Sequence, residues 1–256
     1  MRRAHELLPG AAPIRLTVQT RASSGRTGLT SAASLCVKES GRGSARCGGA
    51  APPGGLLLYL LRHGETVFNI EGRYQGGCDS PLTARGSAQA RCIGAHLARL
   101  APCATLWVSP LPRAQASADL IAAEIAQHTG APPARQLRTE LREIALGDWD
   151  GLTRAEMEAL APGFRKRHPR RQWMFHAPGG EPLDAVLARL AQVHRAARAH
   201  PGDLVLVTHA FTGRLLRGLH AGLPLEEAVT LTAPQDAFHL LAPDGRVEAI
   251  DASARP

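Results

Sequence analysis

Five side chains of this sequence are of the types that transfer a phosphoryl group. Arg62 and His63 are adjacent, and Arg113, Glu143 and His209 follow further along the chain. Phosphoryl transfer without a metal requires a nucleophile, cations that neutralise the phosphate oxygens, and an acid that protonates the leaving oxygen. Histidine can be the nucleophile, arginine offers planar bidentate donors to phosphate, and a glutamic acid can supply the proton. These residue types together suit a dianionic ligand.

Three short apolar runs are expected to position these side chains. Residues 56–61, 104–109 and 203–207 read as buried strands, and the loop after each one holds an arginine, a histidine or both. In an open α/β sheet, ligands bind beyond the carboxyl ends of the parallel strands. We therefore expect the three loops to meet at one edge of a sheet.

Helical spacing separates these strands, and Thr153 with Glu156 three residues later forms the pattern of a capping box. The alternation of helices and strands predicts an α/β fold, a three-layer α/β/α sandwich with a mostly parallel central sheet. The expected helices are 83–100, 112–129, one after Thr153, 183–199 and 213–220, and the further strands are 137–141, 229–232, 237–241 and 247–250.

Several ordered motifs around these residues carry a family resemblance. From about residue 56 to about residue 241 the chain resembles the histidine phosphatase superfamily, which includes the cofactor-dependent phosphoglycerate mutases, and it is similar to α-ribazole phosphatase-type enzymes. The resemblance implies a phosphoglycerate mutase-like fold. Its motifs are Leu60 to Asn69 (LLRHGETVFN), Arg73 to Gly76 (RYQG), Asp79 to Thr83 (DSPLT), Ser109 to Ala114 (SPLPRA), Leu141 to Glu143 with Gly147 to Gly151, Pro178 to Glu181, and Val207 to Ala210.

The resemblance implies roles for the phosphate-binding residues. His63 would attack phosphorus and form a phosphohistidine. Arg62, Arg113 and His209 would bind the phosphate oxygens, and Asn69 would donate a hydrogen bond to the same group.

Three further positions take their expected roles from the same resemblance. Glu143 would protonate the leaving alcohol and then deprotonate the water that hydrolyses the intermediate. Gln75 and Gly76 occupy a position that touches substrate or phosphate. Glu140 is a rival acid, but the spacing to the following glycine and tryptophan favours Glu143. Ala145 and Ala210 depart from the residues common in the family and leave the shape of the pocket open.

Three functions are compared for this pattern. The favoured one is a metal-independent phosphomonoesterase without a cofactor, in which water accepts the phosphoryl group. The alternative is mutase-type transfer, but the segment between Gly151 and Pro178 is short, and the chain lacks the longer insertion and tail that cover a mutase site. An inactive phosphate-binding protein is disfavoured because all five chemical side chains are present. The expected partner is a small phosphorylated metabolite, and a homodimer is left open.

Charge and composition exclude other partners. The formal net charge is +8, but residues 1–55 hold eight basic and two acidic residues, so the rest of the chain is close to balance. We therefore expect no nucleic acid as partner. No apolar run reaches the ~18 residues of a membrane span. The five cysteines form no CxxC pair, so we expect reduced thiols rather than a disulfide framework or zinc site.

Residues 1–55 differ from the rest of the chain in amino-acid composition and in hydrophobic periodicity. They lack periodicity and are rich in Arg, Ser, Gly, Ala and Pro, as in disordered segments. A flexible tail or an upstream start artefact is favoured over an organellar transit peptide, and a cytoplasmic location is expected. Residues 56–256 are predicted to form the histidine phosphatase domain, and removal of the leader is expected to leave turnover intact.

Overall fold

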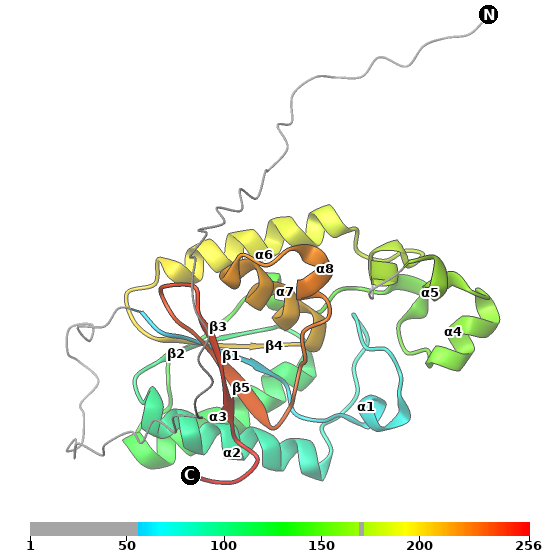
Figure 1. The fold of residues 1–256 in the computed structure, drawn as a ribbon. Helices are drawn as coiled ribbons and strands as arrows, with labels where there is room; N and C mark the ends of the chain where they lie inside the picture. Colours follow the sequence, from blue (N-terminus) through cyan, green and yellow to red (C-terminus); the bar gives the residue numbers. More distant parts are fainter. Residues whose placement is uncertain (1–55, 169–171) are drawn as a thin grey trace, which may run out of the picture. The chain divides into compact units, whose positions relative to one another are not determined.

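The sheet has the architecture that the sequence predicts. The computed structural model describes residues 56–168 and 172–256, and within them six strands lie in the order β3-β2-β4-β1-β5-β6 (Figure 1). The parallel pairs are β1 with β4, β4 with β2, and β2 with β3. The strand β5 pairs antiparallel with β1 on one side and with β6 on the other. The strands are β1 Leu58–Arg62, β2 Thr105–Val108, β3 Arg135–Leu137, β4 Leu204–Thr208, β5 Ala237–Leu241 and β6 Val247–Asp251.

Helices cover both faces of this sheet, which confirms the predicted three layers. In Figure 1, α2 and α3 lie below the sheet and α6 and α7 lie above it, while α4 and α5 stand apart at one end. The α-helices are α1 Val67–Glu71, α2 Ala84–Leu100, α3 Pro112–Thr129, α4 Arg154–Leu160, α5 Phe164–Arg167, α6 Leu183–Arg198, α7 Ala210–Ala221 and α8 Leu225–Ala228; short 3₁₀ helices are η1 Thr139–Leu141, η2 Gly147–Trp149 and η3 Gln172–His176.

The period of two along β1 explains why it is apolar throughout. Tyr59 and Leu61 pack with α2 and α3, whereas Leu58 and Leu60 pack with α6 and α7. Successive side chains of a strand point to opposite faces, so a strand covered on both faces reads as a continuous apolar run. Burial of each such leucine contributes roughly 2 kcal/mol.

The register brings the candidate residues to one edge of the sheet. Arg62 lies opposite Thr208, and Val108 lies opposite Val207. The amide of His63 donates to the carbonyl of Thr208 over 2.9 Å. The ends of β1, β2 and β4 are therefore adjacent, as expected from the sequence.

Two predicted strands are wrong or displaced. The strand expected at 137–141 lies at Arg135–Leu137, and Thr139–Leu141 is a 3₁₀ helix whose Leu141 is fully buried. The strand expected at 229–232 does not form: α8 ends at Ala228, and Val229 enters the core from the turn that follows. Short apolar runs do not distinguish a strand from another buried segment.

One helix begins earlier than expected, and one helix was not expected. α7 begins at Ala210, directly after His209, rather than at 213. α1 was not predicted and opens with a capping box of Thr66 and Asn69. The predicted capping box of Thr153 and Glu156 is present at α4.

Some expectations concern residues outside the described part of the chain. The predicted leader, 1–55, lies there, and the boundary at 55/56 stays a prediction. Within the described residues no helix is long and apolar enough to cross a membrane. Among the described residues, Cys78 and Cys92 are free thiols.

Candidate active site

His63 is buried and held as the neutral tautomer that a nucleophile needs. Its Nδ1 lies 2.7 Å from the carbonyl oxygen of Gly64. A carbonyl only accepts, so Nδ1 carries the proton and Nε2 keeps its lone pair. Burial, together with the positive charges of Arg62 and Arg113, lowers the pKa of His63 well below its usual value. The imidazole is therefore neutral at neutral pH, with its single proton on Nδ1.

His209 lies beside His63 at the end of β4. The ring centroids of the two histidines are 5.2 Å apart, and Nε2 of His209 forms a 2.7 Å hydrogen bond with Oγ of Ser109. Burial first, and then the charge of Arg113, lowers the pKa of His209 well below its usual value. The end of β2 thus orients a side chain at the end of β4.

The two predicted phosphate-binding arginines are held differently. Arg62 donates Nη1 to the carbonyl of Ala233 over 3.0 Å, and burial lowers its pKa to about 10. Arg113 is buried, and its Nη1 donates to Asp79 over 2.8 Å and to the carbonyl of Cys78 over 2.7 Å. Its Nη2 donates to the carbonyl of Gly76 over 3.0 Å.

Three buried nitrogen atoms of this cluster have no hydrogen-bond partner within the described chain. They are Nε of Arg62, Nε of Arg113 and Nδ1 of His209. Buried polar atoms are rarely left unpaired, because desolvation without a hydrogen bond is costly. Their presence in three residues expected to bind one phosphate group supports an anion as the ligand.

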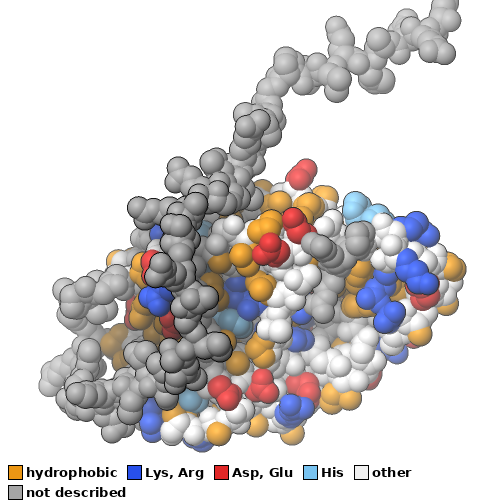
Figure 2. All heavy atoms as spheres, in the orientation of Figure 1, with side chains coloured by type: hydrophobic (Ala, Val, Ile, Leu, Met, Phe, Trp, Pro, Cys, Tyr) orange, Lys and Arg blue, Asp and Glu red, His pale blue; other side chains and the backbone are white. Residues whose placement is uncertain are grey.

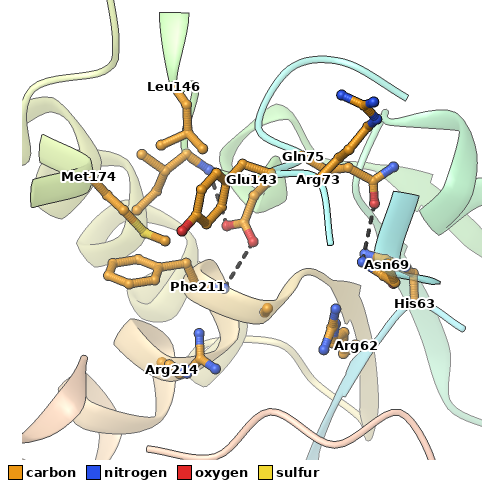
Figure 3. Close-up of a pocket in the computed structure, with 13 residues that line it drawn as sticks. Arg62, His63, Asn69, Arg73, Gln75, Glu143, Leu146, Met174, Phe211 and Arg214 are labelled. Carbon is orange, nitrogen blue, oxygen red and sulfur yellow. Dashed lines mark hydrogen bonds between the residues drawn. The ribbon is translucent and has the colours of Figure 1, made fainter. Parts of the chain in front are cut away.

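Asn69 and Gln75 form a polar wall beside His63. Asn69 Nδ2 donates to Gln75 Oε1 over 3.4 Å, and Gln75 Nε2 donates to Ser80 over 2.8 Å. Figure 3 shows the first of these bonds next to His63. Gly76 does not line the cavity: its amide donates to Asp150 over 2.6 Å, and its carbonyl accepts from the buried guanidinium described above.

Glu143 is fixed by the N-terminus of α7. Its Oε2 accepts from the amide of Phe211 over 2.9 Å, and its Oε1 accepts from the amide of Thr212 over 2.9 Å and its hydroxyl over 3.1 Å. The amides of the first turn of a helix have no partner within the helix, so a carboxylate is a natural acceptor for them. The rival Glu140 pairs with Arg138 instead.

A cavity of about 140 Å³ lies between His63 and Glu143. Figure 3 shows Arg62, His63 and Asn69 on one side of it and Glu143 with Phe211 on the other. Of the eight predicted site residues, Arg62, His63, Asn69, Gln75 and Glu143 line it, whereas Gly76, Arg113 and His209 do not. The remaining wall residues are Arg73, Tyr74, Ile144, Leu146, Met174, Ala210, Phe211 and Arg214.

Comparison with known proteins identifies the family. Residues 58–253 match the histidine phosphatase superfamily (branch 1). The chain belongs to this superfamily. Membership makes it an enzyme of phosphatase or mutase type, and it agrees with the resemblance seen in the sequence motifs.

Relatives within the histidine phosphatase superfamily include both types. A 2,3-bisphosphoglycerate-dependent phosphoglycerate mutase 2 from Gloeobacter violaceus is 37% identical over 133 residues, which cover 52% of this chain and 59% of the mutase. A glucosyl-3-phosphoglycerate phosphatase from Mycobacterium tuberculosis is 37% identical over 177 residues, which cover 65% of this chain and 74% of that phosphatase.

Solved structures of the superfamily share the fold. A mycobacterial glucosyl-3-phosphoglycerate phosphatase in complex with VO₃ has a TM-score of 0.61 at 30% identity, covering 77% of this chain and 98% of that one. An Escherichia coli K-12 protein described as an α-ribazole-5′-P phosphatase has a TM-score of 0.64 at 24% identity, covering 77% and 96%, and supports the fold alone.

One residue beside His63 is not among those predicted from the sequence. Gln235 donates Nε2 to the carbonyl of His63 over 3.2 Å and to Asn69 Oδ1 over 2.9 Å. It lies in the loop before β5, far from every motif, so no local pattern could identify it.

Among the described residues no group of three or more His, Cys, Asp or Glu side chains could hold a metal ion.

Proposed function

We propose that the chain is a metal-independent phosphomonoesterase that hydrolyses a small phosphorylated metabolite through a phosphohistidine on His63. The observation that carries this proposal is the neutral imidazole of His63, with Nδ1 bonded to a carbonyl and Nε2 left as a nucleophile. It lies against arginines and beside a second histidine, in a cavity of about 140 Å³ that suits a small substrate.

The proposed reaction has two displacements at phosphorus. In the first, Nε2 of His63 forms a bond to phosphorus, the bond to the leaving oxygen breaks, and Glu143 gives that oxygen a proton. In the second, water attacks the phosphohistidine, Glu143 takes the proton of the water, and the bond between phosphorus and Nε2 breaks. Arg62 and Arg113 neutralise the charge of the phosphate oxygens in both steps, and the neutral His209 donates a hydrogen bond to them from Nδ1.

Substitution of the nucleophile tests this function. Wild-type protein is expected to hydrolyse p-nitrophenyl phosphate in the presence of a chelator, and His63→Ala is expected to abolish turnover. Acid-labile phosphate on His63, detected by mass spectrometry after rapid quenching, would report the intermediate. His128→Ala, an exposed residue at the end of α3, is the matched control. Turnover that survives His63→Ala, or that requires a divalent cation, would overturn the proposal.

Mutase-type transfer is the second candidate, favoured by the similarity to the phosphoglycerate mutase of Gloeobacter violaceus. A mutase must keep water from the phosphohistidine, so the two functions differ in the acceptor. Assays with phosphoglycerates and 2,3-bisphosphoglycerate, run beside a panel of phosphorylated metabolites, separate them. We expect net phosphate release to exceed phosphoglycerate interconversion, and the reverse would establish the mutase.

A further inference from the structure

Arg189 and Glu181 form a buried ion pair that contacts the backbone of the segment that carries Glu143. Arg189 of α6 donates Nε to Glu181 Oε1 over 2.8 Å and Nη2 to Glu181 Oε2 over 2.9 Å. Both side chains are buried, at 7% and 8% exposure. A buried pair of this kind gives little net stability, because the loss of hydration offsets the attraction between the charges. Its geometry therefore calls for another explanation.

The third nitrogen of the same guanidinium binds the backbone next to Glu143. Nη1 of Arg189 donates to the carbonyl of Glu140 over 2.7 Å and to the carbonyl of Arg142 over 2.9 Å. The amide of Glu181 donates to the carbonyl of Ala145 over 2.9 Å. The guanidinium of Arg189 thus binds carbonyls that precede Glu143 in the chain, and the amide of Glu181 binds a carbonyl that follows it.

The other side of this segment is bound to the strand and helix that carry His209. The hydroxyl of Thr208 donates to the carbonyl of Leu141, and that of Thr212 to the carbonyl of Arg142, both over 2.8 Å. Thr212 also donates to the carboxylate of Glu143 itself. The acid is therefore located between α7, which binds its carboxylate, and Arg189, which binds its backbone.

We propose that Arg189, held by Glu181, is a positioning residue that sets the carboxyl group of Glu143 for proton transfer to the leaving oxygen. This inference rests on the proposed function and adds a residue to it. Because Arg189 acts through Glu143, its loss impairs leaving groups that need a proton and spares those that do not.

A pair of aryl phosphates of similar size tests this role. p-Nitrophenol is a good leaving group without protonation, whereas phenol needs an acid. For Arg189→Lys, which keeps the charge but not the planar fork, we expect the ratio of kcat/KM for p-nitrophenyl phosphate to that for phenyl phosphate to rise about tenfold. For Glu143→Gln we expect a rise of roughly 100-fold. A ratio measured on one preparation does not depend on the folded fraction.

The double variant separates positioning from a general structural role. If Arg189 acts through Glu143, Arg189→Lys adds no further change in the ratio to Glu143→Gln. Arg195→Lys, an exposed arginine of the same helix, is expected to leave the ratio unchanged. An unchanged ratio in Arg189→Lys, or additive changes in the double variant, would overturn the inference alone. A wild-type protein that hydrolyses neither ester would overturn the proposed function and the inference with it.

Discussion

At the scale of the residue, the protonation state of His63 decides what the site can do. The carbonyl of Gly64 assigns the proton to Nδ1, and burial with two nearby arginines disfavours a second proton. An imidazole that was protonated at both nitrogens would have no lone pair for phosphorus. The same arginines that are proposed to bind the phosphate therefore also keep His63 in the form that the proposed reaction needs.

The lowered pKa of His63 gives a prediction for solution. An ordinary histidine gains its second proton near pH 6.5, but His63 is expected to stay neutral well below that pH. Nitrogen chemical shifts of histidine-labelled protein, assigned by comparison with His63→Gln, measure this directly. The unfolded protein is the reference. Titration of His63 at or above the unfolded midpoint would contradict the prediction.

Gly76 gives a second prediction at this scale. A Cβ at this position would meet the carbonyl oxygen of Ile144 and Oδ1 of Asp150 at distances that real contacts do not reach, whereas a Cβ at Gly77 would lie 3.3 Å from Asp150 Oδ2. Gly76→Ala is expected to cost about 3 kcal/mol of unfolding free energy, because backbone must move. It is also expected to lower activity, because Arg113 binds the carbonyl of Gly76.

Gly77→Ala is the matched control, since the end of a single flexible side chain can absorb its methyl group. We expect it to change the unfolding free energy by less than about 1 kcal/mol. Urea unfolding of the two variants gives both values. Equal stabilities would show that the close approach at Gly76 is not required.

At the scale of the element, the turn between α8 and β5 organises the arginines of the site. Three arginines donate to three successive carbonyls: Arg214 to Leu231, Arg217 to Thr232 and Arg62 to Ala233. Gln235 at the end of the same turn binds the carbonyl of His63 and Asn69. This turn thus holds both His63 and Arg62, the proposed nucleophile and one of the proposed phosphate-binding residues.

Gln235→Leu tests the role of this turn. The change removes two hydrogen bonds, each worth about 1 kcal/mol, and frees the loop that carries His63. We expect kcat/KM for p-nitrophenyl phosphate to fall about tenfold, since small displacements of reacting groups are costly. Gln192→Leu, an exposed glutamine of α6, is the control. A variant with the kcat/KM of wild type would show that Gln235 does not position the nucleophile.

At the scale of the whole molecule, neutral histidines that are fully or partly buried link stability to pH. His194 and His220 are joined by a 3.2 Å hydrogen bond, and His239 accepts from Arg217 over 2.7 Å. Burial lowers the pKa of His194 and of His239 to about 4 and also lowers that of His220. On the face that Figure 2 shows, Lys and Arg side chains gather over α4 and α5.

These histidines predict a loss of stability in acid. Their folded pKa values lie below the unfolded value near 6.5, so the unfolded chain takes up protons first as the pH falls. The stabilisation is complete above about pH 6.5 and declines between there and about pH 4. Urea unfolding at a series of pH values measures the slope.

A glutamine at one buried position isolates the effect. His239→Gln keeps an acceptor for Arg217 but cannot titrate, so it is expected to reduce the slope of stability against pH between 6.5 and 4. His128→Gln, at an exposed position, is expected to leave that slope unchanged. Stability that stays constant or rises as the pH falls through this window would contradict the assignment.

The family, the alternation of strands and helices, and the residue types at the strand ends could all be predicted from the sequence. These features are local: apolar runs such as 56–61 reflect burial on both faces, and the motif around Arg62 and His63 is contiguous. Sequence reasoning failed at 229–232, because a short apolar run is compatible with any buried backbone.

Only the tertiary structure decided how those residues act together. The tautomer of His63 depends on a carbonyl, the place of Glu143 depends on the first amides of α7, and both depend on partners such as Arg189 and Gln235. Hydrogen bonds of this kind join residues that are up to 172 positions apart, and no spacing along the chain records them. The pairing of β4 with β1 and β2 brings these distant residues to one edge of the sheet, so the contiguous motif alone does not create the site.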